Sequence, residues 1–391
     1  MQIRIDELRE KIRTRARPPF NAAPDLDTIA RPRLTGTSGA AAVTGAVRSR
    51  FQDLGYQVDD RPFEFSAWPG RFGLSAAGAI LLSASVAAGV FLLSGRAVAA
   101  IVALALGGAA LAAVGLFAGR ALDALPWGRQ VAVNLLARRP ERRPRYLIMA
   151  HRDSKSQLVP LLLRAPALVV AVLGWATLLL FALLSLADPV PEPLVFSIAI
   201  AAVLAGTVVT LCWADDESPG ALDNATGVAA LIGIAERESE HGDVAFLITD
   251  AEELGLAGAR AAARRLPAVF GVINLDGLDD EGTFYVLERF GWPRRGLAPH
   301  LALALLSAAA ALDVPARRRD VPFGVMLDHM PIVNGGTTAL TLMRGELSSM
   351  RRVHRPADSR ERIRGAGVSA AVELVCTALG VLRTQEPARP D

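Results

Sequence analysis

The feature that most constrains this chain is a set of four long apolar stretches, each the length of a membrane-spanning helix. They occupy roughly residues 72–94, 97–119, 165–187 and 194–213. A bilayer-crossing helix takes about 20 apolar residues. Helices of a large soluble core are the alternative interpretation, but such helices rarely stay uncharged for so long, and here the pattern occurs four times in two close pairs. We therefore expect four transmembrane helices.

The four stretches form two predicted hairpins. Only Gly95 and Arg96 separate the first pair, and the prolines of DPVPEP, residues 188–193, end both helices of the second pair. Each hairpin enters and leaves the membrane on one side, so both are expected to be insertions in a single soluble domain. The predicted division is 1–70 for N-terminal helices and a first strand, 71–120 for hairpin 1, 121–160 for further strands, 161–214 for hairpin 2, 215–384 for the catalytic core and 385–391 for a tail.

The remaining segments alternate between strands and helices. Strands are predicted at residues 57–65, 130–137, 145–150, 243–249, 269–275 and 338–342. Helices are predicted at 37–54, 227–236, 256–266, 299–312 and 368–382. This alternation predicts an α/β fold, a doubly wound and mostly parallel sheet with helices on both faces.

Charge and cysteine content limit the function and the location. The 42 Lys and Arg residues nearly balance the 39 Asp and Glu residues, so no nucleic-acid partner is expected. Cys212 and Cys376 are too few for a disulfide framework, and the N-terminal segment lacks the apolar core of a signal peptide.

Positive charge near the predicted spans indicates the orientation. Arg and Lys gather on the soluble-domain side, at Arg61, Arg71, Arg120, Arg129, Lys155 and Arg164. The hairpin tips carry only Arg96 on one, and Asp188 with Glu192 on the other. By the positive-inside rule, we expect an integral protein of a bacterial-type plasma membrane with its catalytic domain in the cytoplasm.

Polar residues with metal-binding side chains follow the predicted strands. His151 and Asp153 end one strand, Glu252 and Glu253 follow the next, and Asp276 ends a third. Asp223 precedes a helix, and His354 lies in a loop. Because ligand sites of open α/β sheets lie at the carboxyl ends of strands, these side chains are expected to converge. Their nitrogen and oxygen atoms suit zinc, with manganese or cobalt as alternatives.

Five segments resemble the zinc aminopeptidases of peptidase clan MH, a family with bacterial di-zinc aminopeptidases, glutamate carboxypeptidase and glutaminyl cyclase. They are AHRDS, GALDNATGVAAL, FLITDAEELGLAGA, VINLDG and HRPAD, in the family's order. The resemblance covers roughly residues 35–66 and 130–384, without the second hairpin. It implies a metallopeptidase with two zinc ions, acting as an aminopeptidase on peptides with a free N-terminus, and the four predicted spans would anchor it in the membrane.

The resemblance also implies a role for each residue. His151 and Asp276 would bind one zinc, Glu253 and His354 the other, and Asp223 would bridge both. Glu252 would be the general base, and Asp153 would hold His151 in one tautomer. Asp328 and His329 match a family segment that supports the site.

The group that would stabilise the oxyanion is not identified from the sequence. Some relatives carry a tyrosine just before the final histidine, where this chain has Val353.

Two other functions remain open from the sequence. Members without catalysis serve as receptors or subunits of membrane complexes, but here every expected ligand is present. A glutaminyl-cyclase-like acyl transfer uses one zinc and dispenses with the ligand equivalent to His151. The sequence predicts a lipid bilayer as a partner and gives no oligomeric state.

Overall fold

The computed structural model describes residues 5–14, 18–120, 126–322 and 324–385. The chain divides into two compact units that alternate along the sequence. Unit 1 comprises residues 1–63, 131–155 and 216–391, and unit 2 comprises residues 64–130 and 156–215. Both predicted hairpins fall within the ranges of unit 2. The predicted domain boundaries themselves stay a prediction.

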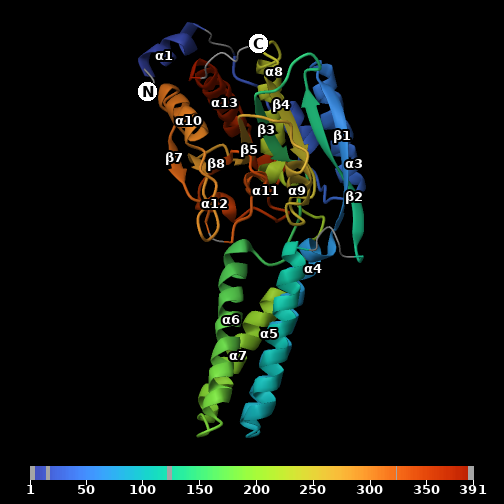
Figure 1. The fold of residues 1–391 in the computed structure, drawn as a ribbon, viewed down its shortest axis with the longest axis vertical. Helices are drawn as coiled ribbons and strands as arrows, with labels where there is room; N and C mark the ends of the chain where they lie inside the picture. The colour runs from blue at the N-terminus through green and yellow to red at the C-terminus, as the bar shows by residue number, and fades with distance from the viewer. Residues whose placement is uncertain (1–4, 15–17, 121–125, 323, 386–391) are drawn as a thin grey trace. The chain divides into compact units, whose positions relative to one another are not determined.

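Unit 1 holds a central eight-stranded sheet (Figure 1). Most residues of β1 and β2 belong to unit 1, and the few that remain belong to unit 2. The strands are β1 (Gln57–Ser66), β2 (Arg129–Arg138), β3 (Tyr146–His151), β4 (Val244–Thr249), β5 (Gly271–Leu278), β6 (Thr283–Leu287), β7 (Ala316–Arg319) and β8 (Ala339–Gly345). The order across the sheet is β1-β2-β4-β3-β5-β8-β6-β7.

The helical segments of unit 1 connect these strands. They are α1 (Ile5–Thr14), α2 (Ala23–Ile29), α3 (Ser38–Asp53), η1 (Ala221–Ala225), α8 (Thr226–Arg237), α9 (Ala257–Ala263), α10 (Pro299–Ala311), α11 (His329–Asn334), α12 (Leu347–Met350), η2 (Arg360–Arg362) and α13 (Ala366–Gln385).

The centre of the sheet is parallel, as predicted. β3 pairs in parallel with β4 and β5, and β5 pairs in parallel with β8. The strands β2 and β6 run antiparallel to their neighbours β4 and β8. Since β3, β4, β5 and β8 point the same way, the segments that follow them begin at one edge of the sheet.

Side chains of β3 alternate between two cores, which confirms helices on both faces of the sheet. Tyr146, Ile148 and Ala150 belong to the larger core with α3, α8, α10 and α13. Leu147 and Met149 belong to the smaller core with α9 and α11. The alternation follows from the period of two in a strand, and it fixes the face of the sheet to which the last side chain of β3 points.

The sequence analysis missed β6 and β7. The segment 316–319, for which no strand is predicted from the sequence, is the edge strand β7, paired in parallel with β6. Its sequence ARRR has no apolar alternation because three of its four side chains are exposed. An edge strand outside the core needs no buried face, so the usual strand signal is absent.

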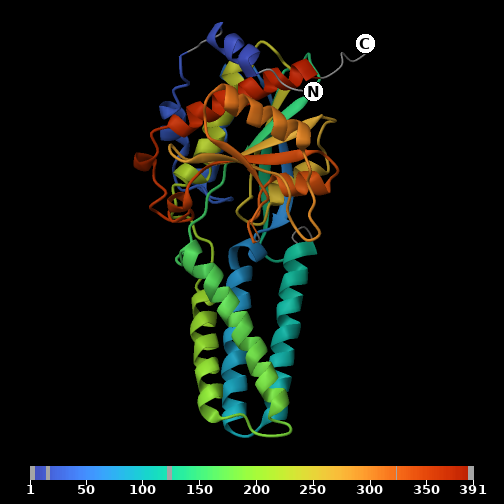
Figure 2. The same ribbon diagram turned by 90° about the vertical axis from the view of Figure 1, so that its left-hand side faces the viewer.

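Unit 2 contains four helices in two hairpins, α4 (Trp68–Leu93) with α5 (Ala97–Arg120) and α6 (Leu161–Leu184) with α7 (Glu192–Thr210). Figure 2 shows these helices running side by side, and Gly78 of α4 lies against the main chain of Val209 and Thr210 in α7. A Cβ atom on Gly78 would lie 2.3 Å from the main-chain nitrogen of Thr210, so only glycine fits there. The helices of unit 2 therefore pack through small residues.

Among the residues that the structure describes, five helices are long and apolar enough to cross a membrane: α4, α5, α6, α7 and α13. The first four have mean hydropathies of 2.2 to 2.6, whereas that of α13 is 1.5. The sequence analysis had placed α13 in the soluble domain. In the structure, α13 packs in unit 1 against α8 and α10, and its side chains contribute to the larger core.

Candidate metal centre

The predicted ligands come from segments that follow the strands at one edge of the sheet in unit 1. His151 is the last residue of β3, Asp276 lies near the end of β5, and Glu252 and Glu253 follow β4. His354 lies in the loop between α12 and η2. All these side chains are buried or nearly so, although all five are ionisable as acids or cations within a mainly apolar fold.

Asp223 lies between the two histidines. One of its carboxylate oxygens, Oδ1, is 3.2 Å from Nε2 of His151, and the other, Oδ2, is 3.2 Å from Nε2 of His354. Each histidine also faces a second carboxylate. Nε2 of His151 is 3.7 Å from Oδ1 of Asp276, and Nε2 of His354 is 3.1 Å from Oε2 of Glu253.

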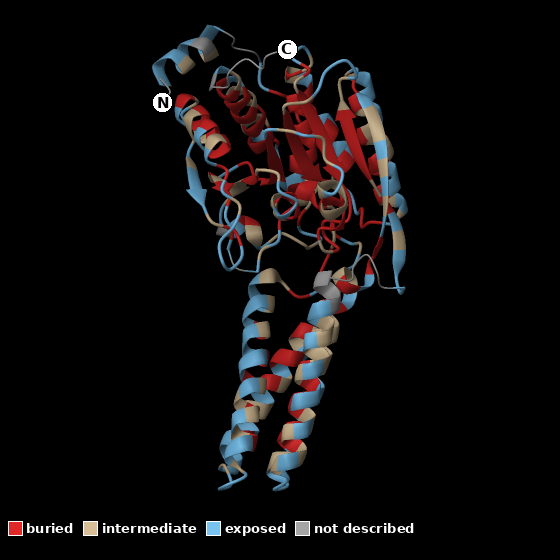
Figure 3. Cartoon of the chain, viewed as in Figure 1, coloured by how far each residue is buried: buried red, intermediate tan, exposed pale blue. Residues whose placement is uncertain are grey.

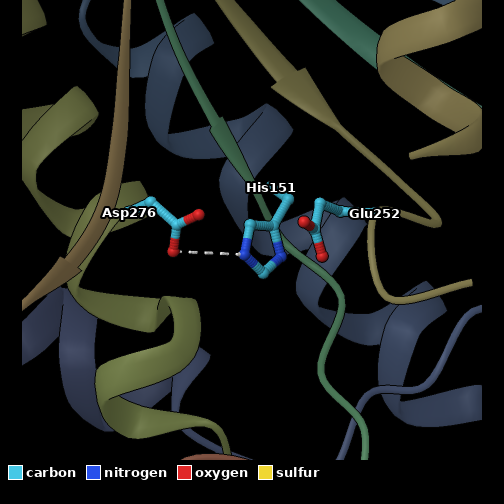
Figure 4. Close-up of side chains that lie close together, drawn as sticks. All are labelled: His151, Glu252 and Asp276. Atoms are coloured by element: carbon cyan, nitrogen blue, oxygen red, sulfur yellow. Dashed lines mark ion pairs between the residues drawn. The ribbon is translucent and has the colours of Figure 1, made fainter. Parts of the chain in front are cut away.

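These distances define two adjacent groups of possible ligands. One contains His151, Glu252 and Asp276, shown in Figure 4, and the other contains Asp223, Glu253 and His354. In Figure 4 the ring of His151 lies between the two carboxylates, from β5 on one side and from the segment after β4 on the other. Glu252 is thus close enough to the first group to serve either as a ligand or as a base.

The donor set fits zinc. Imidazole nitrogen and carboxylate oxygen are usual zinc ligands, and each group offers both kinds. Oε1 of Glu253 is buried and accepts no hydrogen bond from the described residues. Burying a carboxylate oxygen without a partner is costly, so a cation at this position would compensate the cost.

Asp153 organises three of these residues. Its two carboxylate oxygens accept hydrogen bonds from the main-chain N–H groups of Glu252 and Glu253, at 3.1 and 3.0 Å. Its main-chain oxygen lies 3.2 Å from Nδ1 of His151. With the proton on Nδ1, the lone pair of Nε2 is directed to the carboxylates of Asp223 and Asp276.

The turn that presents Asp223 is held by buried side chains. Oδ1 of Asn224 accepts hydrogen bonds from the N–H groups of Gly227 and Gly277. A Cβ atom at Gly227 would lie 2.6 Å from the main-chain oxygen of Leu275, so glycine is required for α8 to approach β5 this closely. Asn224 and Gly227 therefore hold the turn that presents Asp223.

The neighbouring acids Glu252 and Glu253 lie in opposite electrostatic environments. Burial raises the pKa of Glu252 well above its usual range, and the negative charge of Glu253 adds to the effect despite the opposing field of His151. Burial also acts on Glu253, but His354 and Lys155 outweigh it and lower its pKa to about 2. Two adjacent carboxyl groups with separated pKa values suit one proton-transfer role and one ligand role.

Two further residues at the site were named in the sequence analysis, and they lie in the interior. Oδ2 of Asp328 accepts a hydrogen bond from the hydroxyl of Thr249, and burial raises the pKa of Asp328 to about 7. His329 is enclosed by the hydroxyl of Thr341 and the main-chain oxygen of Glu288. Val353 packs against the larger core.

The sequence analysis did not assign Asp358, Arg33 or Lys155. Asp358 accepts hydrogen bonds from the N–H groups of Leu222 and Asp223, at 2.8 and 3.0 Å. The HRPAD segment contained this signal, because Asp358 belongs to the same motif as His354.

The contacts of Arg33 and Lys155 with the site are identified only from the structure. The guanidinium of Arg33 is fully buried and donates to the main-chain oxygens of Arg152, Pro219 and Gly220, so it ties the segment after β3 to the segment before η1. Nζ of Lys155 lies 2.8 Å from Oε2 of Glu253. The position of Lys155 shortly after His151 was the only sequence signal for it.

Comparison with known proteins gives one matching family model. The model of Peptidase family M28 matches residues 133–379, which is more than half of the chain. No curated protein matches the sequence.

Several solved structures share the fold at low sequence identity. A glutaminyl cyclase from Porphyromonas gingivalis has a TM-score of 0.55 and 16% identity, over 97% of this chain and 98% of that chain. An aminopeptidase from Aneurinibacillus sp. strain AM-1 has a TM-score of 0.54 and 14% identity, over 96% and 95%. The zinc aminopeptidase BSAP from Bacillus subtilis has a TM-score of 0.55 and 15% identity, over 94% and 96%.

Proposed function

Because the chain belongs to peptidase family M28, we propose that it is a membrane-anchored di-zinc aminopeptidase that removes residues from the free N-terminus of peptides. The observation that carries the proposal is the position of Asp223, whose two carboxylate oxygens each face a different histidine at 3.2 Å. A carboxylate that bridges two ions is the central ligand of a two-metal hydrolytic site.

The proposed ligand sets follow the two groups in the structure. His151 and Asp276 would hold one zinc ion, Glu253 and His354 would hold the other, and Asp223 would serve both. When bound, the zinc ions supply Lewis-acid polarisation of a carbonyl group and lower the pKa of water. Manganese and cobalt are alternatives for the same ligands.

Residues of the chain perform the proton transfers. Glu252 accepts a proton from the attacking water and delivers it to the leaving amine, for which a raised carboxyl pKa is suitable. Asp153 keeps His151 in the tautomer that ligates through Nε2, and it fixes the main chain of Glu252 and Glu253. Asp358 fixes the main chain of Asp223 in the same way.

The test is a purification of the full chain in detergent, followed by metal analysis and a screen of aminoacyl and dipeptide substrates. We expect about two zinc ions per chain, as in two-metal sites generally, and release of free N-terminal amino acids that a chelator abolishes. Fewer than one ion per chain after zinc loading would refute the proposal. Cyclisation of N-terminal glutaminyl peptides without hydrolysis would instead favour the cyclase alternative, and metal binding without turnover would favour a scaffold.

For the membrane, we propose that α4, α5, α6 and α7 span the bilayer and that α13 does not. Their high hydropathy and largely exposed apolar side chains support this, while α13 packs in the core of unit 1. The excess of arginine and lysine near the span ends supports a cytoplasmic catalytic domain.

Cysteine labelling in intact cells tests the orientation. Asp188→Cys at the α6–α7 tip, in a background without Cys212 and Cys376, should react with an impermeant thiol reagent. Arg317→Cys on β7 should not react until the cells are opened. The reverse pattern would place the catalytic domain outside the cell.

A further inference from the structure

An exposed patch of arginine and tryptophan lies at the β7 edge of the sheet in unit 1, where Figure 1 labels β7. It is formed by the loop after β6 and by β7, and we call it the arginine–tryptophan patch. Its members are Arg289, Trp292, Arg294, Arg295, Arg317, Arg318 and Arg319.

Trp292 lies at the tip of a tight hairpin in this patch. The hairpin is closed by two hydrogen bonds of 3.0 Å between the main chains of Phe290 and Arg295. The side chain of Phe290 is buried and anchors the hairpin, whereas Trp292 is 92% exposed. Leu297, just beyond the hairpin, is also exposed. Phe290 at the base thus holds the hairpin in place while Trp292 projects from it.

The patch carries an excess of positive charge. Among the described residues, only two carboxylates lie within ion-pair distance of its six arginines. Arg318 pairs with Glu288 at 2.7 Å, and Arg289 pairs with Asp320 at 2.8 Å, with Arg294 3.7 Å from the same aspartate. Arg295 and Arg317 face no carboxylate within ion-pair distance among the residues that the structure describes. Four positive charges therefore remain uncompensated.

The arginines also enclose a hollow. A cavity of about 400 Å³ is lined by Arg289, Arg318, Arg319 and Asp320. The guanidinium of Arg319 is held above the ring of Tyr285 at 5.1 Å. Guanidinium groups that line one cavity suit the oxygens of a phosphate group, which they can bind bidentately.

We propose that the arginine–tryptophan patch binds phosphate-bearing headgroups of anionic lipids, with Trp292 at the level of the bilayer interface. The inference rests on the proposed membrane association. Arginines on an edge strand also prevent edge-to-edge pairing, but that role does not account for an exposed tryptophan beside them. Tryptophan favours membrane interfaces, and basic clusters are attracted to the anionic leaflet that faces the cytoplasm.

A lipid surface fits better than an acidic peptide for one further reason. Short connections join unit 1 to the candidate spans at each change of unit, so a bilayer that holds the spans is always available to unit 1 at high effective concentration. Docking of the patch would restrain the catalytic unit against the membrane.

The experiment uses the full chain, without Cys212 and Cys376, in nanodiscs. Trp292→Cys is labelled with an environment-sensitive bimane, and quenching by nitroxide-labelled lipid is measured in discs of phosphatidylcholine alone or with about 30% phosphatidylglycerol, an anionic content chosen to give a negative surface. We expect strong quenching only in the anionic discs, reduced by high salt.

Two triple variants separate the patch from general charge. The first combines Arg294→Gln, Arg295→Gln and Arg317→Gln, and it leaves the arginine that pairs with buried Glu288 unchanged. Each of these three substitutions should lower the ratio of docked to free molecules by about fivefold. The matched control replaces Arg142, Arg143 and Arg265, exposed arginines elsewhere on unit 1, with glutamine and should leave the quenching unchanged.

Several outcomes would overturn the proposal. These are equal quenching in neutral and anionic discs, or an equal loss in the control variant. In neutral discs, the same bimane response to inorganic phosphate would indicate a free-phosphate site, and the same response to an acidic peptide would indicate a protein partner. Failure of the chain to enter discs at all would refute the membrane association, while leaving the peptidase assays in detergent unaffected.

Discussion

The two units place their apolar and polar side chains in opposite ways. In unit 1 the sheet is apolar inside, yet it buries the carboxylates and histidines of the candidate site at one edge. In unit 2 the buried positions are mostly small residues such as Ala88, Ala182 and Ala202, and large apolar side chains such as Leu106 and Leu173 are exposed. Figure 3 shows the exposed faces along the helices of unit 2.

This contrast is the one expected if unit 1 lies in water and unit 2 in lipid, as proposed. Water surrounds a fold that hides its large apolar side chains, as the core of unit 1 does. A fold that displays them suits lipid, in which helices associate through small residues that allow close packing. The close packing at Gly78 is of this kind. α13 shows that hydropathy alone does not decide between the two, because it is apolar enough to span a membrane and is nevertheless packed in the core of unit 1.

The largest effect is expected when the proposed base in the buried site of unit 1 is removed. Glu252→Gln keeps the size of the side chain and removes its ability to accept a proton, so turnover should fall on the order of a thousandfold. Metal content should stay unchanged, as measured by elemental analysis alongside the hydrolysis of an aminoacyl substrate.

The adjacent acid is the matched control. Glu253→Gln should lose metal as well as activity, because Glu253 lies 3.1 Å from Nε2 of His354 in the proposed ligand set. Equal metal loss in both variants would make Glu252 a ligand, a role that its proximity to His151 and Asp276 also permits.

A charge placed on each unit's exterior is expected to have the next largest effect. Leu173→Arg puts a charge on the exposed face of α6, and at the centre of a span this disfavours membrane insertion by about 3 kcal/mol. Leu303→Arg makes the same change on the exposed side of α10 in unit 1, where water solvates the charge. The fraction of protein recovered in the membrane after alkaline extraction measures both, and equal recovery would remove the distinction between the units.

A smaller effect is expected from a buried residue that supports the ligands. Asp153→Asn retains the shape of the side chain, but an amide cannot accept both main-chain hydrogen bonds from Glu252 and Glu253. Zinc affinity should fall by about tenfold to a hundredfold, measured by competition with a chromogenic chelator. Unchanged affinity would show that Asp153 does not position the ligands.

The sequence was sufficient for the parts of the fold that follow local rules. Strands with buried faces, such as β3 and β4, have continuous apolar runs, and polar residues directly after such strands were expected to meet at one edge of the sheet. The structure brings His151, Asp223, Glu252, Glu253, Asp276 and His354 together there, while their individual roles stay predictions.

The parts that were missed depend on tertiary contacts. β7 has the polar sequence of a loop and becomes a strand only because β6 offers a pairing edge. Arg33 lies far in sequence from the segments that its guanidinium joins, so no local pattern indicates it. Likewise, the ion pair between Lys155 and Glu253 depends on the relative positions of the segments after β3 and β4.

The smallest expected effect tests the assignment of α13 to unit 1. Glu373 on α13 is partly exposed, and Oε1 lies 3.1 Å from Nη2 of Arg237 on α8. In water such a partly exposed pair contributes less than about 1 kcal/mol, so Glu373→Ala should shift the thermal unfolding midpoint by no more than a few degrees. If α13 instead crossed the bilayer, removing its charge would favour insertion and raise membrane recovery, as the loss of a charge does in any span. Differential scanning fluorimetry and alkaline extraction on the same variant therefore decide between a core helix and a fifth span.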